Sequence, residues 1–339
     1  MIKIFCILYS EFQSSIVTQI QTQKRNPIRQ LPSIVINKIA AGEVIERPAS
    51  VVKELLENSV DAGATQIELS IEQGGTELIR VTDDGCGMPP EQLELAVTSH
   101  ATSKITDDAD LFRVGTFGFR GEALASIASV SQMSIVSRTE ADDCATELVI
   151  NGGHHEPLQP VGAPIGTTIS VRQLFYNTPV RKKFLRTAQT EKGHISEAFT
   201  RVALAHPEIA MTLLNNGKVL HKLPATENWH ERIHAFFGAE ISEALIPIES
   251  EHNDISIQGY VCDPHVSRGN NKMQYLFLNH RHIRDRSLQH ALGEAYRGLL
   301  MTGRYPLCFL RLSMPFEICL LYTSPSPRDL STSRMPSSA

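Results

Sequence analysis

The run from Lys53 to Asp61, K-E-L-L-E-N-S-V-D, combines chemically useful side chains with helical spacing. Glu54, Asn58 and Asp61 recur at intervals of four and three residues, so a helix presents them on one side. The apolar side of the same helix is formed by Val51, Val52, Leu55, Leu56 and Val60. A carboxylate one turn before a carboxamide suits a base that orients water beside an oxygen ligand for Mg²⁺. The spacing also fits a solvated helix face, and the downstream segments decide between these interpretations.

Three glycine-bearing stretches follow this helix. Asp83 to Gly87 reads D-D-G-C-G at the end of a predicted strand, where an aspartate can accept a hydrogen bond from an adenine amine. Gly115 to Gly121 reads G-T-F-G-F-R-G and leads into a predicted helix, an arrangement whose backbone N–H groups suit phosphates. Gly166 to Thr168 reads G-T-T, and its hydroxyls are in a position to reach adenine or an ordered water. A P-loop motif and a Rossmann fingerprint are both absent from the sequence.

The elements that must position these residues alternate between helix and strand. Pro48 suits the first turn of the opening helix, and Gly63 suits its C-terminal cap. Strands are predicted at 66–72, 78–82, 134–137, 147–150 and 167–171, and further helices at 89–99 and 122–130. Residues 100–120 are predicted to be a flexible loop. The pattern favours an α/β sandwich with helices on one face of a largely antiparallel sheet.

A second, smaller α+β unit is predicted to begin at residue 225. Its expected strands are 256–261, 274–279 and 306–312, with a helix at 287–300. The domain prediction is therefore an N-terminal extension at 1–25, a first domain at 26–224, a second at 225–318, and a tail at 319–339. The tail is rich in Ser and Pro, so we expect it to be disordered, and it resembles translated sequencing-adapter read-through.

Composition limits the possible functions. The chain has 339 residues, 42% of them hydrophobic, and a net charge of -5, so any DNA contact must come from local patches. Two cationic clusters suit DNA phosphates, although each also fits a solvated charge run. They are Arg181, Lys182, Lys183 and Arg186, and Arg281, Arg284 and Arg286. The six cysteines show neither zinc nor disulfide spacing, and no apolar run is long enough to cross a bilayer, so we expect a cytoplasmic protein without a membrane partner.

The order of the motifs E-x-x-x-N, D-x-G-x-G, G-x-x-G-x-x-G and G-T-T resembles the Bergerat-type ATP site. Type II topoisomerases, a heat-shock chaperone family, sensor histidine kinases and the MutL mismatch-repair family share that site. Longer strings are similar to the MutL family over roughly residues 26–318, at Ile39–Thr65, His100–Lys104, Gly118–Ile127 and Leu174–Phe184. The resemblance implies an α+β chain, in which a Bergerat-type α/β sandwich ATPase domain precedes a small domain like ribosomal protein S5.

The resemblance also implies roles for individual residues. Glu54 would be the general base and Asn58 the Mg²⁺ ligand. Asp83, Gly87 and Thr168 would form the adenine side of the site. Thr102, Ser103 and Lys104 would belong to a lid over ATP, and Gly118, Phe119, Arg120 and Gly121 would cradle phosphate. Lys53 is interpreted as a surface partner of a neighbouring acid rather than as a phosphate ligand.

The function implied is that of a DNA mismatch-repair ATPase and molecular matchmaker with ATP and Mg²⁺ as cofactors. ATP would order the lid and promote an N-terminal homodimer. The partners would be DNA, bound weakly and without sequence preference, a mismatch-recognition protein of the MutS type, and a downstream endonuclease or helicase. Two alternatives are another enzyme of the same ATP fold and a nucleotide-insensitive, DNA-binding scaffold fragment.

Two departures from the family pattern affect these expectations. His280 stands where the family has the glycine of N-G-R, which puts the local turn in question. After Ile318 the sequence does not continue into the family's D-V-N-V-H-P-x-K string, whose lysine reaches the γ-phosphate. We therefore expect this polypeptide to turn ATP over slowly.

Overall fold

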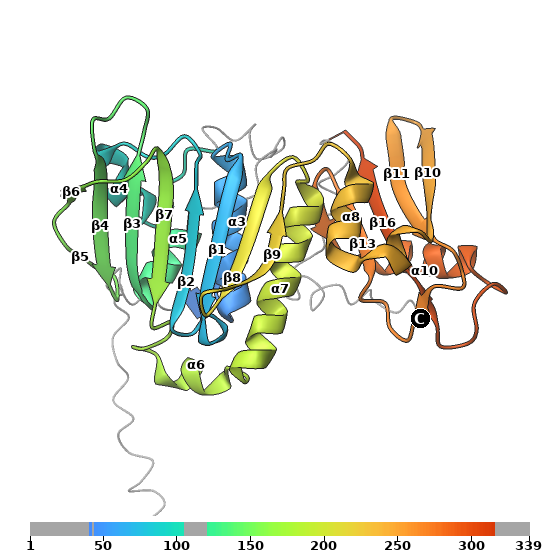
Figure 1. Ribbon diagram of the computed structural model, residues 1–339. Helices are drawn as coiled ribbons and strands as arrows, with labels where there is room; N and C mark the ends of the chain where they lie inside the picture. The colour runs from blue at the N-terminus through green and yellow to red at the C-terminus, as the bar shows by residue number, and fades with distance from the viewer. Residues whose placement is uncertain (1–40, 43, 105–120, 316–339) are drawn as a thin grey trace, which may run out of the picture. The chain divides into compact units, whose positions relative to one another are not determined.

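The computed structural model describes residues 41, 42, 44–104 and 121–315. All of these belong to one compact unit, Asn37–Ala339. The predicted N-terminal extension, the predicted tail and the phosphate-cradle residues Gly118, Phe119 and Arg120 lie outside the described residues. The described chain forms a large sheet with helices against it, followed by a smaller sheet with helices of its own (Figure 1).

The large sheet has nine strands, in the order β5-β4-β3-β7-β2-β1-β8-β9, with β6 paired to β4. The strands are β1 (Gln66–Glu72), β2 (Leu78–Asp83), β3 (Gln132–Arg138), β4 (Ala145–Asn151), β5 (His154–His155), β6 (Gln159–Val161), β7 (Gly166–Arg172), β8 (Ala210–Asn215) and β9 (Lys218–Leu223). Neighbouring strands are antiparallel except for β1 and β8, which are parallel. The predicted largely antiparallel sheet is confirmed.

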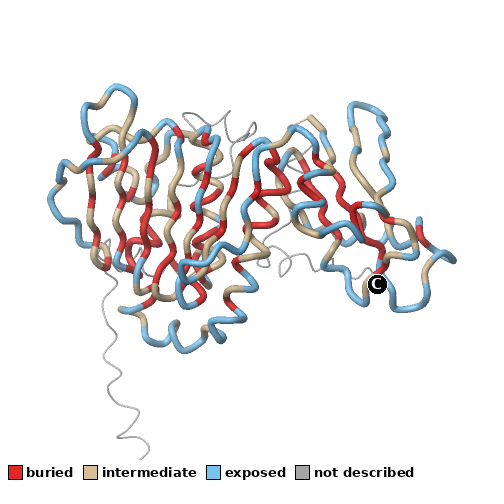
Figure 2. The backbone as a smooth tube through the Cα atoms, in the orientation of Figure 1, coloured by how far each residue is buried: buried red, intermediate tan, exposed pale blue. Residues whose placement is uncertain are grey.

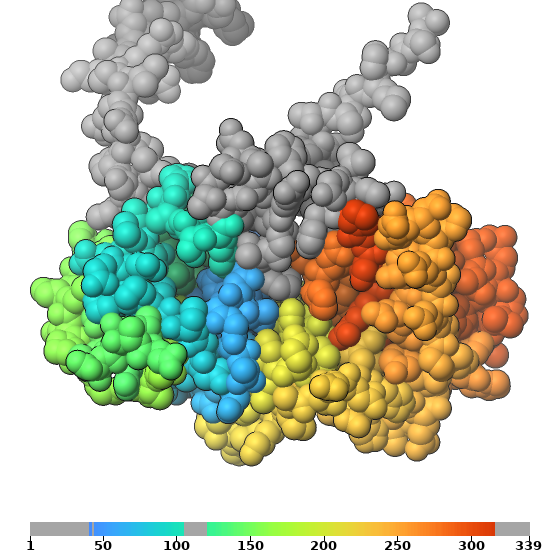
Figure 3. Space-filling view, turned by 90° about the horizontal axis from the view of Figure 1, so that it is seen from above, coloured from blue at the N-terminus to red at the C-terminus, as the bar shows by residue number. Residues whose placement is uncertain are grey.

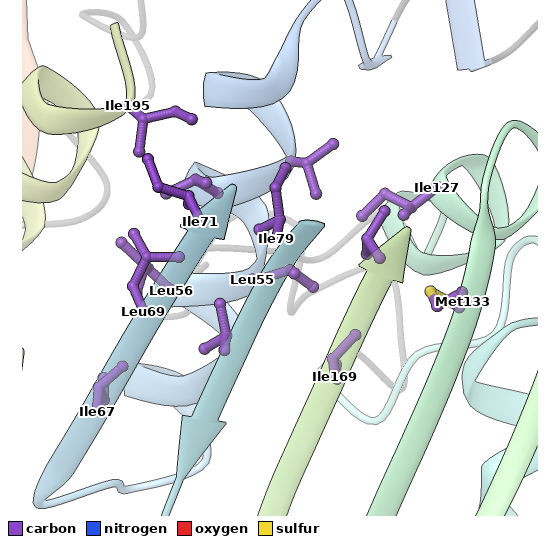
Figure 4. Close-up of a cluster of buried hydrophobic side chains, with 14 of the residues drawn as sticks. Leu55, Leu56, Ile67, Leu69, Ile71, Ile79, Ile127, Met133, Ile169 and Ile195 are labelled. Carbon is purple, nitrogen blue, oxygen red and sulfur yellow. The ribbon is translucent and has the colours of Figure 1, made fainter. Parts of the chain in front are cut away.

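The helices of this part of the chain are α3 (Pro48–Asp61), α4 (Pro90–Ala96), α5 (Ala123–Ser129), α6 (Pro179–Phe184) and α7 (Ala188–Ala205), with a 3₁₀ turn, η1, at Gln73–Gly75. In Figure 1, α3, α4 and α5 lie behind the sheet, as the sandwich prediction requires. Figure 4 shows Leu55 and Leu56 of α3 facing Ile67, Leu69 and Ile79 from β1 and β2. All five side chains are buried, so removal of apolar surface from water holds the helix on the sheet. Figure 2 shows the same alternation of buried and partly exposed positions along the strands.

The boundaries of α3 follow from local chemistry, as predicted. Pro48 occupies the first turn, where its missing N–H costs nothing. At the other end Gly63 has φ +72 and donates its N–H to Val60 O, while the N–H of Ala64 reaches Ser59 O. This is a Schellman arrangement, which needs a residue without a Cβ in the left-handed region. The helix therefore ends where the chain must turn toward β1.

The smaller sheet has the order β10-β11-β16-β13-β14. Its strands are β10 (Leu245–His252), β11 (Ile255–Cys262), β13 (Gln274–Leu278), β14 (Arg281–Ile283) and β16 (Cys308–Ser313), and β12 (Ser267–Arg268) pairs separately with β15 (Tyr305–Pro306). The accompanying helices are α8 (Trp229–Phe237), α9 (Ala239–Ser242) and α10 (Arg286–Ala295). The predicted α+β character is confirmed, and α10 ends earlier than the predicted helix at 287–300.

Helix α8 is anchored to the last turn of α7 and to residues that flank β8 and β9. Trp229 Nε1 donates to Leu204 O at 2.8 Å, and Arg232 Nη2 donates to the carbonyls of Ile209 and Pro224 at 2.8 and 2.9 Å. Arg311 from β16 covers the Trp229 ring, with its guanidinium carbon 4.1 Å from the ring centroid. The predicted boundary at residue 225 falls between β9 and α8 and stays a prediction.

The β13–β14 hairpin forms despite the histidine at its tip. Leu278 pairs with Arg281, so Asn279 and His280 make a two-residue turn, with φ of +46 and +67. Such a turn requires the left-handed region at both positions, and asparagine tolerates it better than histidine. The His280 ring stacks on His206 with their centroids 5.7 Å apart, a contact that favours the strained backbone.

Candidate functional site

The polar side of α3 carries the first part of the site. Asn58 Oδ1 accepts a hydrogen bond from Lys104 Nζ at 2.9 Å, and Asp61 Oδ2 lies 2.5 Å from the same nitrogen. Lys104 belongs to the segment after α4, so the fold brings a predicted lid residue to the predicted metal ligand. Figure 3 shows the blue surface of the α3 segment beside the cyan surface of the residues that follow β2. Glu54 lies one turn earlier on α3, with 23% of its side chain exposed.

Asp83 at the end of β2 is joined to the same helix. Its Oδ2 accepts from the Ser59 hydroxyl at 2.7 Å, and its Oδ1 accepts from the Gly85 N–H at 3.0 Å. Burial raises the pKa of Asp83 although these hydrogen bonds oppose the shift. Each carboxylate oxygen has a second lone pair, so Asp83 keeps capacity to accept from a ligand.

The adjacent Asp84 has a different use. Its Oδ1 accepts from the N–H groups of Thr65 and Gln66 at 2.7 and 2.8 Å, and its Oδ2 accepts from the Thr65 hydroxyl at 2.5 Å. Burial would raise the pKa of Asp84, but the bonds from Thr65 and Gln66 outweigh it and lower the pKa. Asp84 therefore fixes the turn between α3 and β1.

Glycine is required on both sides of Asp83. Gly87 has φ +71, and a Cβ there would overlap the carbonyl of Arg138. Gly166 has φ +120, and a Cβ there would overlap the carbonyl of Asp83. Close approach of three backbone segments explains the glycine at each position. The structure thus packs predicted residue Gly87 on the end of β3, and Gly166 on the strand end that carries Asp83.

Strand register separates the two threonines of G-T-T. Asp83 pairs with Thr167, whereas Thr82 pairs with Thr168. Side chains alternate between sheet faces, so Thr167 shares the face of Asp83 and Thr168 lies on the opposite face, where its hydroxyl donates to Thr82 Oγ1 at 3.1 Å. The structure therefore does not bring the predicted residue Thr168 to Asp83. Thr167 is the residue that the motif alone did not single out, and alternation from Asp83 was the signal for it.

The ends of the predicted lid are held together. The His100 N–H donates to Gly121 O at 2.9 Å, and His100 Nδ1 lies 3.3 Å from Glu122 Oε1. Gly121 has φ +60, and a Cβ there would overlap the carbonyl of Ala101. Within the lid, Thr102 Oγ1 accepts from the Lys104 N–H at 3.2 Å. Ser103 lies between them in sequence, and Lys104 joins this segment to α3 through Asn58 and Asp61.

The first predicted DNA cluster divides into an inner and an outer part. Lys182, Lys183 and Arg186 are exposed, as phosphate contacts require. Arg181 is only partly exposed, and a Cβ added to Gly42 would overlap its Nη2. Its guanidinium therefore packs against the segment that leads into α3.

The second predicted cluster also divides. Arg284 and Arg286 are exposed. Arg281 lines a cavity of about 320 Å³ together with Lys53 and Glu57 of α3. The Nζ of Lys53 lies 3.0 Å from an oxygen of Glu54 and 3.0 Å from one of Glu57, which confirms the interpretation of this lysine as a partner of neighbouring acids.

The residues present fit Mg²⁺ and a nucleotide. Asn58 Oδ1 already faces a cationic group, the ammonium of Lys104, so the position suits positive charge. In the described part of the chain, no three or more His, Cys, Asp and Glu side chains gather as a metal site. A Mg²⁺ at Asn58 would therefore take its other ligands from phosphates and water, which is the usual arrangement for this ion.

The fold and the site define the class of protein. Residues 45–165 match the family model described as histidine kinase-, DNA gyrase B-, and HSP90-like ATPase. Among solved structures, the Aquifex aeolicus MutL ATPase domain complexed with ADP aligns with a TM-score of 0.63 and 31% identity, over 86% of this chain and 100% of that one. The N-terminal domain of a DNA repair protein aligns with a TM-score of 0.72 and 27% identity, over 83% and 87%. The chain therefore has the ATPase fold of this class.

The particular family follows from the second part of the chain and from full-length relatives. Residues 233–325 match the model of the DNA mismatch repair protein C-terminal domain. The MutL protein of Halothermothrix orenii is 44% identical over 91% of this chain, and that of Geobacter sulfurreducens is 47% identical over 86%. The chain belongs to the MutL family of DNA mismatch repair proteins. It spans about half the length of the curated relatives it matches, 48% in both cases.

Proposed function

We propose that this chain binds Mg-ATP between α3 and the ends of β2 and β7 and hydrolyses it. The observation that carries the proposal is the connection of Asp83 to α3 through Ser59 at 2.7 Å. It supports the proposal because it holds Asp83, the proposed adenine acceptor, beside the helix that carries Glu54 and Asn58. A family member built on this fold would use the nucleotide state to control mismatch repair.

Each side chain of the proposed site has its own role in binding or hydrolysis. Asp83 accepts the adenine amine, and Thr167 adds a hydroxyl on the same sheet face. Asn58 would hold Mg²⁺, and the bound ion would neutralise phosphate charge. Glu54 orients the water that attacks the terminal phosphorus and accepts its proton as the bond to the leaving phosphate oxygen breaks. The Lys104 ammonium would leave Asn58 for a phosphate, because it and Mg²⁺ would repel each other at the same amide oxygen.

Nucleotide binding is expected to order the lid, with Thr102, Ser103 and Lys104 at one end and Gly118, Phe119, Arg120 and Gly121 at the other. Ordering would favour N-terminal homodimers because ATP binds that state better. The partners proposed are DNA, a mismatch-recognition protein of the MutS type, and a downstream endonuclease or helicase. None of the described helices has the length and apolarity that a membrane span needs.

The test is Glu54→Ala. It should retain binding of a non-hydrolysable ATP analogue and lose hydrolysis by about 100-fold or more. Glu72→Ala, at an exposed position at the end of β1, is the matched control and should hydrolyse normally. Normal hydrolysis by Glu54→Ala would show that this base assignment is incorrect.

The nucleotide-insensitive scaffold remains a second candidate because Lys182, Lys183 and Arg186 are exposed and none of them belongs to the proposed nucleotide site. It predicts salt-dependent DNA binding that ATP analogues do not change. Failure of equilibrium dialysis to detect analogue binding to the unmodified protein would favour this function over the ATPase.

A further inference from the structure

Lys53 lies between two carboxylates of α3. Its Nζ is 3.0 Å from Glu54 Oε1 and 3.0 Å from Glu57 Oε2. The Lys53 side chain is 53% exposed, whereas those of Glu54 and Glu57 are 23% and 14% exposed, so the lysine covers two more deeply placed acids. The spacing of Lys53 and Glu57 favours their pairing, but adjacent residues do not face each other on a helix. The Glu54 carboxylate must therefore lean toward Lys53 to share its ammonium.

The two neighbouring acids favour the charged form of Lys53. Burial would lower the pKa of Lys53, but the attraction of Glu54 and Glu57 outweighs it and raises the pKa. Burial raises the pKa of Glu57, and the charges of Lys53 and Arg281 oppose that shift. Glu57 is thus a shared counter-ion for a lysine on α3 and an arginine on the β13–β14 hairpin.

The cavity of about 320 Å³ joins these groups in space. Lys53, Glu57 and Val60 line it from α3, and Arg281 lines it from the hairpin. The stacking of His280 on His206 holds the hairpin against the end of α7. Arg281 therefore stands at the junction of the proposed ATPase helix and the second predicted DNA cluster.

We propose that Lys53 is a positioning residue for the Glu54 carboxylate. We further propose that Arg281, acting through Glu57, adjusts how firmly Lys53 holds that carboxylate. The inference rests on the proposed role of Glu54 as the base. An ammonium held at Oε1 fixes the carboxylate rotation and leaves Oε2 to face the water. If the charge of Arg281 is removed, or is engaged by a DNA phosphate, Glu57 draws Lys53 more strongly. The hold on Glu54 then loosens.

The first test is the split between kcat and KM in Lys53→Met. Misplacement of the base should lower kcat about tenfold, while KM and the Kd for a non-hydrolysable analogue stay within about twofold of the unmodified protein. Lys53→Arg should restore most of the loss, and Lys218→Met on exposed β9 is the control. A weakened analogue Kd would instead make Lys53 a phosphate ligand, and an unchanged kcat would remove its role. Either result overturns the inference.

A double-mutant cycle separates this inference from the proposed function. Lys53→Met should add nothing in the Glu54→Ala background if it acts through Glu54. Normal hydrolysis by Glu54→Ala would remove the proposed base and the inference with it. An inactive Glu54→Ala with a fully active Lys53→Met would remove the inference alone.

The contribution of Arg281 is tested without DNA, so that a change in DNA affinity cannot explain the result. Arg281→Gln should lower kcat about two- to fivefold with an unchanged analogue Kd. The same change should have no effect in the Glu57→Gln background, because Arg281 is proposed to influence Lys53 through the Glu57 carboxylate. If Arg281→Gln lowered kcat equally in the unmodified protein and in Glu57→Gln, Arg281 would not act through Glu57. Glu57→Gln by itself provides a second measurement of Lys53 positioning if Lys53→Met fails to fold.

Discussion

Lys104 Nζ donates a hydrogen bond to Asn58 Oδ1 at 2.9 Å and lies 2.5 Å from Asp61 Oδ2, although 46 residues separate Lys104 from Asn58. Only 19% of the lysine side chain and 8% of the aspartate side chain are exposed, so the contact lies in a partly desolvated place. The ammonium thereby occupies an oxygen that we propose as the Mg²⁺ ligand. Release of Lys104 from α3 and binding of Mg-nucleotide are expected to occur together.

Lys104→Met should destabilise the nucleotide-free protein. The Asp61 carboxylate would lose a charged partner in a partly buried position, at a cost of about 1–3 kcal/mol in the free energy of unfolding. Urea denaturation of the nucleotide-free protein measures the change. Lys272→Met, at an exposed position before β13, is the control and should stay within about 0.5 kcal/mol. Equal stability of both variants would show that the Lys104 contact contributes nothing.

Asp83→Asn should lose nucleotide affinity without losing stability. The amide can no longer offer a charged acceptor to the adenine amine, so the Kd for ADP should rise about tenfold or more. The pKa of Asp83 is raised in the folded protein, so its ionised form costs folding free energy above that pKa, and the cost disappears as the pH falls toward the unfolded value. Removing the charge should therefore leave Tm at neutral pH unchanged or higher. A lower Tm would mean that the hydrogen bonds from Ser59 and Gly85 outweigh the burial of charge.

Nucleotide affinity should also depend on pH through Asp83. Since burial raises the pKa of this carboxyl, its protonation begins at a higher pH than that of an exposed aspartate. Protonation removes the charged acceptor, so ADP binding should weaken on acidification. Calorimetric titrations with ADP across the acid range test this, with Asp83→Asn as the reference that lacks the Asp83 contribution. The same pH profile in both proteins would contradict the assignment.

Thr167→Val and Thr168→Val should differ. The Thr167 hydroxyl lies 2.9 Å from Ser137 Oγ on the face of Asp83, so its loss should weaken ADP binding about three- to tenfold. Thr168 bonds to Thr82 on the other face, and its replacement should change the Kd by less than about twofold. If Thr168→Val weakened ADP binding more than Thr167→Val, Thr168 would be the residue of the adenine site.

Gly42→Ala should be destabilising because a methyl group there overlaps the guanidinium of Arg181. The guanidinium is the far end of a flexible side chain and can shift aside, so the cost should be at most about 1 kcal/mol. In the Arg181→Ala background the methyl has room, so the cost of Gly42→Ala should fall by at least about 0.5 kcal/mol in a double-mutant cycle measured by urea denaturation. Additive costs would show that the two residues do not touch.

The same packing predicts a division of labour in DNA binding. Lys182→Ala and Lys183→Ala should each lower the salt dependence of DNA binding by about one phosphate contact. Arg181→Ala should leave that slope unchanged, because its guanidinium packs on Gly42 and not toward solvent. A weaker salt dependence of DNA binding in Arg181→Ala would show that Arg181 contacts a DNA phosphate.

Most elements next to the site follow from sequence patterns. Strand β1 has the predicted bounds, and β3, β4 and β7 extend the predicted strands by one or two residues at each end. Alternating or helical spacing of apolar residues marks these elements because one face of each is buried. The patterns do not predict α7, whose first half is polar and contains Gly193, or the exposed edge strand β9. Contacts with α3 and β8 determine those elements, and local spacing does not record them.

The sequence by itself determined the chemistry of this protein: a carboxylate and a carboxamide one turn apart, an aspartate among glycines, and the MutL strings around them. These features are local, and helix and strand periods turn their spacing into shared faces. Only the tertiary structure decided which side chains meet. Strand register placed Thr167 with Asp83, and packing set Arg181 against Gly42, Lys104 on Asn58, and Lys53 near Arg281. Such pairings depend on how distant segments pack, and no spacing within a single element contains that information.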